Sequence, residues 1–209
     1  MTEVVREQVR TLLAVAQTGL QYGRDSFDLE RYRQIREAAT VLLSLVANQP
    51  LGALRRDVEA NVGYATPKVD VRGAVFDEFG RILLTQERSD CQWTLPGGWC
   101  DVGEPASVAV SRELREESGY SARPVRLGAV LDRELHGHTP PMAVHVYKMF
   151  FLCELDGEDR IQPLPNETLD VGWFSIADLP PLSLSRVTEP QLRLLLHLHQ
   201  NPTMATVFD

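Results

Sequence analysis

The sequence predicts an α+β fold in which a small all-helical module, residues 1–62, precedes a larger domain, residues 63–209. Three observations carry this prediction. Residues 1–60 show only the spacing of amphipathic helices. Short β-type runs between residues 69 and 174 surround one helical stretch, and a last helical stretch follows them. The 209 residues, of which 44% are hydrophobic, are enough for one globular domain with an additional module.

The N-terminal module is expected to contain two long helices and one short helix. The first apolar stripe consists of Val5, Val9, Leu12, Leu13, Ala16 and Leu20. We expect Gly19 and Gly23 to break this helix. A second stripe runs from Tyr32 to Val46, with Ser26 or Asp28 as its N-cap, and a shorter helix is expected over residues 51–60. Because such short helices cannot bury their stripes alone, we expect a homodimer, with a partnerless helical lid as the alternative.

The larger domain begins after a joint at residues 63–67. Alternating or β-branched runs predict its strands. These strands are expected at residues 69–75, 81–85, 93–95, 125–135, 143–155 and 169–174. Residues 189–199 are expected to form a closing helix whose inner side carries Leu192, Leu195, Leu196 and His199.

Charge and cysteine content restrict the class of protein. Residues 1–60 carry eight Lys/Arg and eight Asp/Glu, whereas the remaining residues carry 13 and 21, which accounts for the whole net charge of −8. This acidic balance disfavours nucleic-acid binding. No apolar run is long enough to span a membrane. Cys91, Cys100 and Cys153 are odd in number and lack Cys-x-x-Cys spacing, so we expect a reduced, cytoplasmic setting.

The feature that indicates a catalytic or metal-binding site is a Gly-Gly turn, Gly97-Gly98, followed by an acidic helix. Glu113, Glu116 and Glu117 stand at i, i+3 and i+4 and so share one helix face. Arg112 can pair with Glu116 but cannot serve all three carboxylates. Because Mg²⁺ prefers oxygen ligands, this face predicts a Mg²⁺ (or Mn²⁺) site, with a solvated acidic face as the alternative.

The neighbouring positions are consistent with such a helix. Pro105 is tolerated in a first helical turn, and Gly119 suits the left-handed position after the last turn. Val110 and Leu114 form an apolar stripe that must face a core.

These residues resemble the Nudix box at every fixed position. The match consists of Gly98, Glu104, Arg112-Glu113-Leu114, Glu116-Glu117, Gly119 and the apolar Tyr120. The resemblance implies an α/β/α sandwich with a mixed sheet. It also implies a loop–helix–loop that binds a divalent metal and hydrolyses a diphosphate linked to another moiety.

The resemblance also implies a role for each residue of the site. Glu116 and Glu117 would be the main metal ligands, and the Gly97 carbonyl and Glu113 would complete or orient the metal site. Arg112 would hold the glutamates in place, and Glu104 would tie the loop to the helix.

Family members often use a further acid outside the box. Here Glu167 is the candidate, with Asp170 in reserve, although acids in loops are mostly just solvated. The chain shows no Ser-His-Asp or Cys-His arrangement that competes for the catalytic role.

A closer resemblance, to the CDP-choline pyrophosphatase branch, covers nearly the whole chain. It rests on residues 17–20, 25–32, 64–73 and 145–148. The branch is also labelled ADP-ribose pyrophosphatase-like, carries an N-terminal helical module and is linked to dimers. It implies that CDP-choline is hydrolysed to CMP and phosphocholine.

Residues outside the box must select the substrate. Arg72 and Arg133 are the candidates for phosphate contacts, and Tyr147 is the candidate for a base contact. His136 would touch the second half of the substrate, unless it is only a polar residue of its loop. Tyr64 and Trp99 could also stack on a base or cover choline by cation–π attraction.

Three other functions remain open at this point. ADP-ribose hydrolysis is the alternative within the family. An RNA 3′-end exonuclease would share the phosphate chemistry, and a non-catalytic nucleotide sensor would share the fold. The intact box glutamates disfavour the sensor.

Overall fold

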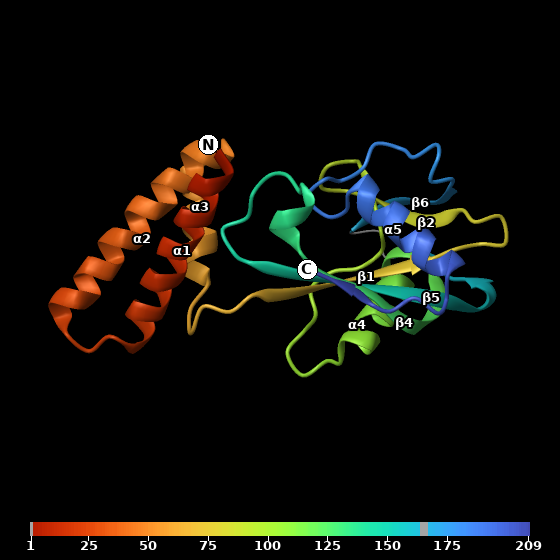
Figure 1. Cartoon of the computed structure of the whole chain (residues 1–209), viewed down its shortest axis with the longest axis horizontal. Coiled ribbons are helices and arrows are strands. Elements are labelled where there is room, and N and C mark those ends of the chain that lie inside the picture. Colours follow the sequence, from red (N-terminus) through yellow and green to blue (C-terminus); the bar gives the residue numbers. More distant parts are fainter. Residues whose placement is uncertain (1, 164–166) are drawn as a thin grey trace. The chain divides into compact units, whose positions relative to one another are not determined.

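The computed structural model describes residues 2–163 and 167–209 (Figure 1). The chain divides into two compact units. Met1–Pro67 and Pro140–His145 form the N-terminal unit, and Lys68–Thr139 and Val146–Asp209 form the larger unit. No helix in the described ranges has the length and apolar character needed to cross a membrane.

The N-terminal unit contains three helices, α1 (Thr2–Tyr22), α2 (Ser26–Ala47) and α3 (Leu51–Ala60). Their apolar stripes meet in one core of Val9, Leu13, Ala39, Leu43 and Leu54, with Ala47, Val58 and Ala143 packed against it. The Gln49 side-chain amide donates to the Pro141 carbonyl at 3.1 Å, which ties residues 140–145 to this unit.

Two details of these helices differ from the prediction. α1 continues through Gly19, because this glycine serves close packing: a Cβ there would lie 2.4 Å from the Tyr32 ring. The N-cap of α2 is Asp25, not Ser26 or Asp28, and its carboxylate accepts hydrogen bonds from the backbone N–H groups of Phe27 and Asp28.

The larger unit contains two sheets. The first has the strand order β1-β5-β4-β7, with β1 at Lys68–Val75, β5 at Val146–Arg160, β4 at Tyr120–Asp132 and β7 at Val207–Phe208. It is mixed, because β1 and β5 are parallel while β4 and β5 are antiparallel. The second sheet is antiparallel, with β2 (Ile82–Glu87) between β3 (Trp93–Thr94) and β6 (Thr168–Phe174).

The predicted strands exist, but some boundaries were wrong. β4 begins at Tyr120 rather than residue 125, and it ends at Asp132 because a 3₁₀ turn, η2 (Arg133–His136), follows. β5 runs over Val146–Arg160 rather than residues 143–155. The short β7 was not predicted; it pairs with Ala129 and Val130 of β4.

Helices cover both faces of the first sheet, as Figure 1 shows. α5 (Glu189–Gln200) packs on one face through Leu192, Leu195 and Leu198, against Phe150 and Leu152 of β5. α4 (Ala106–Glu113) and the π-helical turn η1 (Leu114–Ser118) pack on the other face. The predicted α/β/α sandwich with a mixed sheet is therefore confirmed, and the two faces are called below the α5 face and the α4 face.

Candidate active site

The Gly-Gly turn runs along the open edge of β1. The backbone N–H of Val71 donates to the Gly98 carbonyl at 2.8 Å, and that of Gly73 donates to the Pro96 carbonyl at 2.9 Å. Gly97 lies between these bonds at φ 146°, where a Cβ would stand 2.0 Å from the Val71 carbonyl oxygen. Only glycine fits this position, and its N–H points to the Glu117 carboxylate at 2.9 Å.

The acidic helix begins at Ala106 rather than at Pro105, which is its N-cap, and it widens into η1 after Glu113. Such π turns are frequent at functional sites. Val110 and Leu114 are fully buried, as predicted, and Gly119 ends the helix in the left-handed conformation at φ 78°.

Burial brings two of the glutamates against the Gly-Gly turn. Glu117 reaches Gly97, and a Cβ at Gly98 would lie 2.8 Å from a carboxylate oxygen of Glu113. These two carboxylates are buried, whereas Glu116 is partly exposed beside a surface hollow of about 380 Å³.

Arg112 holds the loop and the other two glutamates together. Its guanidinium donates to both carboxylate oxygens of Glu104 at 3.0 Å, to Glu113 at 2.9 Å and to Glu116 at 3.2 Å. The hydrogen bond to Glu104 is the main cause that raises the pKa of Arg112. No hydrogen bond or ion pair that the structure describes joins Arg112 to Glu117.

The electrostatics of the two buried glutamates fit a cation. Burial raises the pKa of Glu117 to about 8, against the opposing effects of Arg72 and the Gly97 N–H. Burial likewise raises the pKa of Glu113. Burial therefore disfavours their charged forms, and a divalent cation such as Mg²⁺, which prefers hard oxygen ligands, would restore those forms.

Within the described ranges, no three His, Cys, Asp or Glu side chains are grouped closely enough to hold a metal by themselves. A metal ion bound here would therefore need further ligands, and the predicted ones are the Gly97 carbonyl and water, since Mg²⁺ usually keeps several waters.

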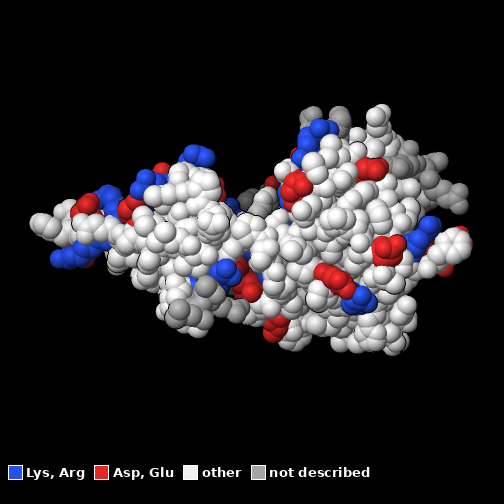
Figure 2. Space-filling model, turned by 90° about the horizontal axis from the view of Figure 1, so that it is seen from above, with Lys and Arg blue, Asp and Glu red and all other residues white. Residues whose placement is uncertain are grey.

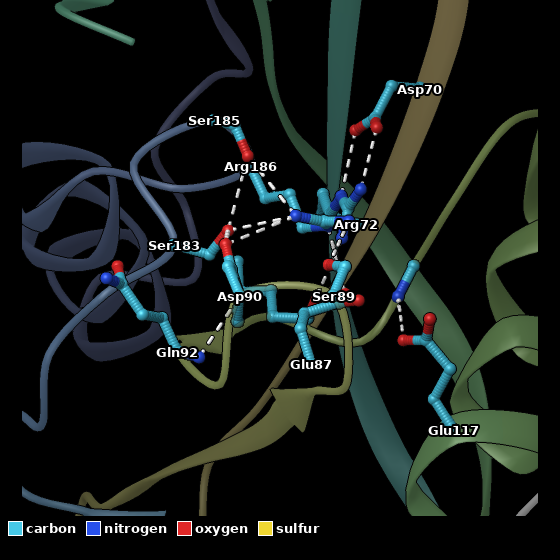
Figure 3. A network of polar contacts seen from close by, with 12 residues as sticks. Asp70, Arg72, Glu87, Ser89, Asp90, Gln92, Glu117, Ser183, Ser185 and Arg186 are labelled. Carbon is cyan, nitrogen blue, oxygen red and sulfur yellow. Dashed lines mark hydrogen bonds and ion pairs between the residues drawn. The ribbon is translucent and has the colours of Figure 1, made fainter. Parts of the chain in front are cut away.

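Figure 3 shows Arg72, Glu87 and Glu117 in one view, and the charges of Arg72 and Glu87 both affect the pKa of Glu117. The buried Arg72 guanidinium donates to Asp70 at 2.9 and 2.8 Å and to the Leu95 carbonyl at 3.0 Å. Glu87, at the end of β2, raises the pKa of both Arg72 and Glu117, and its carboxylate lies 3.0 Å from Arg186. The sequence prediction did not include Glu87 among the site residues. The only feature of the sequence that could have indicated it is its place at the end of a predicted strand.

The acids proposed outside the box lie at the surface. Glu167 is exposed, and its backbone carbonyl accepts from the Arg88 N–H at 2.9 Å. Asp170 is exposed, and its carboxylate accepts from the Val171 N–H at 2.8 Å.

The predicted substrate contacts are divided between the two faces of the sheet. Arg72 and the buried Arg133 both affect the pKa of Lys148 on the α5 face. Arg133 lies 2.8 Å from Glu134. Tyr147 lies on the opposite face, because successive strand residues alternate. His136 contacts the Asp209 carboxylate at 2.8 Å.

Comparisons with known proteins agree with this geometry. Residues 50–196 match the model of the NUDIX domain, and residues 4–56 match the model described as "UDP-X-like, N-terminal oligomerisation domain". The putative ADP-ribose pyrophosphatase YjhB of Bacillus subtilis is 38% identical over 97% of this chain and 96% of its own length.

Two solved structures are also similar. An ADP-ribose pyrophosphatase of Streptococcus suis is 40% identical with a TM-score of 0.61, over 69% of this chain and all of that one. A UDP-X diphosphatase is 27% identical with a TM-score of 0.61, over all of this chain and 99% of that one.

The fold and the site define a pyrophosphohydrolase, an enzyme that cleaves phosphorus-containing anhydrides. The chain belongs to the Nudix family. Members of this family generally use divalent metal cations.

Proposed function

We propose that the protein uses Mg²⁺ (or Mn²⁺) to hydrolyse a pyrimidine nucleoside diphosphate linked to a second moiety, with CDP-choline as the favoured substrate and CMP and phosphocholine as products. The observation that carries the proposal is the pair of buried carboxylates, Glu113 and Glu117, held against the Gly-Gly turn beside Arg72.

Each residue of the candidate active site has a proposed part in this reaction. Glu113, Glu116, Glu117 and the Gly97 carbonyl would hold the cation, partly through its bound waters. When bound, the cation neutralises the diphosphate and lowers the pKa of water. Arg112 keeps Glu113 and Glu116 in place through its bonds to both and to Glu104. Arg72 provides positive charge beside Glu117, where negative charge spreads over phosphoryl oxygens.

The proposal that the nucleoside is a pyrimidine is supported by the whole-length similarity to a UDP-X diphosphatase. The negative charge of the larger unit suits the positive charge of choline. ADP-ribose is the second candidate, favoured by the names of the Bacillus subtilis and Streptococcus suis relatives.

Steady-state kinetics on CDP-choline, UDP-glucose, ADP-ribose and an RNA 3′ end, each with Mg²⁺, test the proposal. We expect kcat/KM to be largest for CDP-choline. A tenfold preference for ADP-ribose, equal to about 1.4 kcal/mol of transition-state free energy, would show that the substrate assignment is wrong. Failure on all four substrates would contradict the reaction itself.

We also propose a homodimer formed through the N-terminal unit. α1 exposes Val4, Val5, Leu12 and Val15, and α2 exposes Leu42 and Leu45. These side chains lie within or beside the stretch that matches an oligomerisation domain. Light scattering on the full chain should give twice the mass of one chain, and Leu45→Glu should shift the mass toward the monomer.

A cytoplasmic location and a lack of nucleic-acid binding complete the proposal. Cys91, Cys100 and Cys153 are free thiols in the structure, which suits a reducing compartment. On the face drawn in Figure 2, Lys and Arg side chains stand among Asp and Glu side chains. This mixed surface lacks the clustering that favours a phosphate backbone.

A further inference from the structure

Lys148 is a buried cation with unused hydrogen-bond donors. It lies on β5, is 2% exposed, and donates to an Asp70 carboxylate oxygen at 2.6 Å. An ammonium group has three N–H donors. Within the described part of the chain, Asp70 is its hydrogen-bond partner and no second one is seen. Unpaired donors on a buried charge are costly, so an anionic acceptor at this position would stabilise the ammonium group.

Strand register places Lys148 near the Gly-Gly turn. Asp70 is paired with Lys148 across β1 and β5, and Trp99 is paired with Asp70 on the open edge of β1. Cross-strand partners point to the same face of a sheet. Trp99, Asp70 and Lys148 therefore form a row on the α5 face, which runs from a ring that is 45% exposed to a buried ammonium.

Arg72 connects this row to the metal side of the site. It follows Asp70 by two residues and so shares the α5 face. A Cβ added to Gly97 would lie 2.9 Å from the Arg72 Cα, so Arg72 borders the glycine whose N–H contacts Glu117.

The charges around Lys148 favour an anion. Burial lowers the pKa of Lys148 to about 8, and Arg72 and Arg133 lower it further, whereas Asp70 raises it. Asp70 is itself shared between Arg72 and Lys148. Burial lowers the pKa of the nearby His138 to about 3, so this ring is neutral and supplies no charge. Glu87 and Glu117 stand beyond Arg72, and Glu87 is paired with Arg186.

We infer that Lys148 and Arg72 form an oxyanion site for one phosphate of the nucleotide, next to the metal site, and that Asp70 positions both cations. Charged N–H donors are the groups that bind phosphate most strongly. Arg72 borders Gly97 and donates to Asp70, and Asp70 accepts from Lys148, so these contacts connect the metal side of the site to Lys148. The choice of a nucleoside phosphate as the ligand rests on the proposed function.

The chain offers an unusually direct test, because Lys68 and Lys148 are its only lysines. NMR of the full chain with ¹³C,¹⁵N-labelled lysine should show two side-chain signals, assigned with Lys68→Arg. In EDTA, CMP and inorganic phosphate should each shift the Lys148 signal to saturation and raise its pKa, and leave that of Lys68 unchanged. A Lys148 signal that does not respond, or that responds equally to cytidine without phosphate, would overturn the inference.

Substitution gives a second measurement. Lys148→Met should weaken CMP binding in EDTA at least tenfold and should raise KM more than it lowers kcat, whereas Lys68→Met should do neither. If the wild type hydrolyses a nucleoside diphosphate derivative and Lys148→Met keeps its KM, the phosphate site is wrong and the proposed function stands. If no substrate is hydrolysed but CMP still shifts the Lys148 signal, the site stands and the function fails. Should Lys148→Met not fold, the NMR titration of the wild type decides.

Discussion

The two faces of the mixed sheet bury ionisable groups of opposite charge, an acid on the α4 face and a base on the α5 face. On the α4 face burial raises the pKa of Glu117 to about 8, and on the α5 face burial lowers the pKa of Lys148 to about 8. In both cases burial disfavours the charged form. The partners differ: Lys148 has a carboxylate, Asp70, whereas the hydrogen bond of Glu117 comes from the Gly97 backbone.

This difference in partners indicates how strongly each face calls for a bound ion of opposite charge. Asp70 already balances part of the positive charge on the α5 face, and Arg72 and Lys148 in turn keep its pKa at about 2 despite burial. The α4 face has no lysine or arginine of its own paired with Glu117 among the described contacts. We therefore propose that the acidic face needs a bound metal cation more than the basic face needs a bound anion.

The largest expected effect is at Glu117. Glu117→Gln should lower Mg²⁺-dependent kcat/KM by about 10³-fold or more, equal to about 4 kcal/mol of transition-state free energy. The melting temperature in EDTA should not fall, because the glutamine side-chain oxygen can still accept the hydrogen bond from the Gly97 N–H. Glu154→Gln, at an exposed position of β5, is the matched control and should retain activity. Near-full activity of Glu117→Gln would contradict the metal-site assignment.

A smaller effect is expected when the clamp around the carboxylates is removed. Arg112→Met and Glu104→Gln should each lower kcat/KM by about 10- to 100-fold, as is typical when the groups that orient metal ligands are lost. Because the two side chains act through one bidentate pair, the double variant should be little worse than either single variant. Arg112→Lys should not restore activity, since lysine lacks the planar fork. Additive losses would show that the two residues act independently.

The acid outside the box can be located by comparing Glu87 with Glu167. Glu87→Gln should lower kcat/KM by about tenfold, because Glu87 is close enough to Arg72 and Glu117 to influence the pKa of both. Glu167→Gln should lower kcat/KM less than Glu87→Gln does, because Glu167 is exposed and is not among the described charges with the largest effect on the pKa of Arg72. A larger loss for Glu167→Gln would support the acid proposed from sequence.

A further prediction concerns the pH dependence of stability and involves the basic face. The folded pKa of Lys148, about 8, lies below its ordinary value of 10.5, so between these values the unfolded state binds more protons. The free energy of unfolding should therefore rise with pH from 8 to 10.5, by at most about 1.4 kcal/mol per unit. Denaturant titrations of the wild type and Lys148→Met should diverge in this direction. A constant difference between the two would contradict the shifted pKa.

Sequence predicted the parts of the site that depend on local spacing. The box glutamates, the buried Val110 and Leu114 and the terminal Gly119 follow from helical periodicity within one segment. The pairing of Asp70 with Lys148 joins residues 78 positions apart, and it depends on a parallel register that no local pattern encodes.

Local errors also have physical causes. Sequence alone predicts that Gly19 breaks the helix, but a glycine inside a helix also allows a neighbouring ring to approach, here that of Tyr32. The sequence is compatible with either role of Gly19, helix breaker or packing site, and only the tertiary packing distinguishes them.

The dependence of the acidic face on a metal cation can be measured directly by calorimetric titration of Mg²⁺ into the metal-free full chain in buffers of different ionisation enthalpy. Because the pKa of Glu117 is about 8 without metal, binding at pH 7 should release close to one proton, since metal ligands must be deprotonated. The release should vanish above about pH 9 and in Glu117→Gln. Mg²⁺ binding without proton release at pH 7, or equal proton release in Glu117→Gln, would contradict the claim that Glu117 is a ligand of the metal cation.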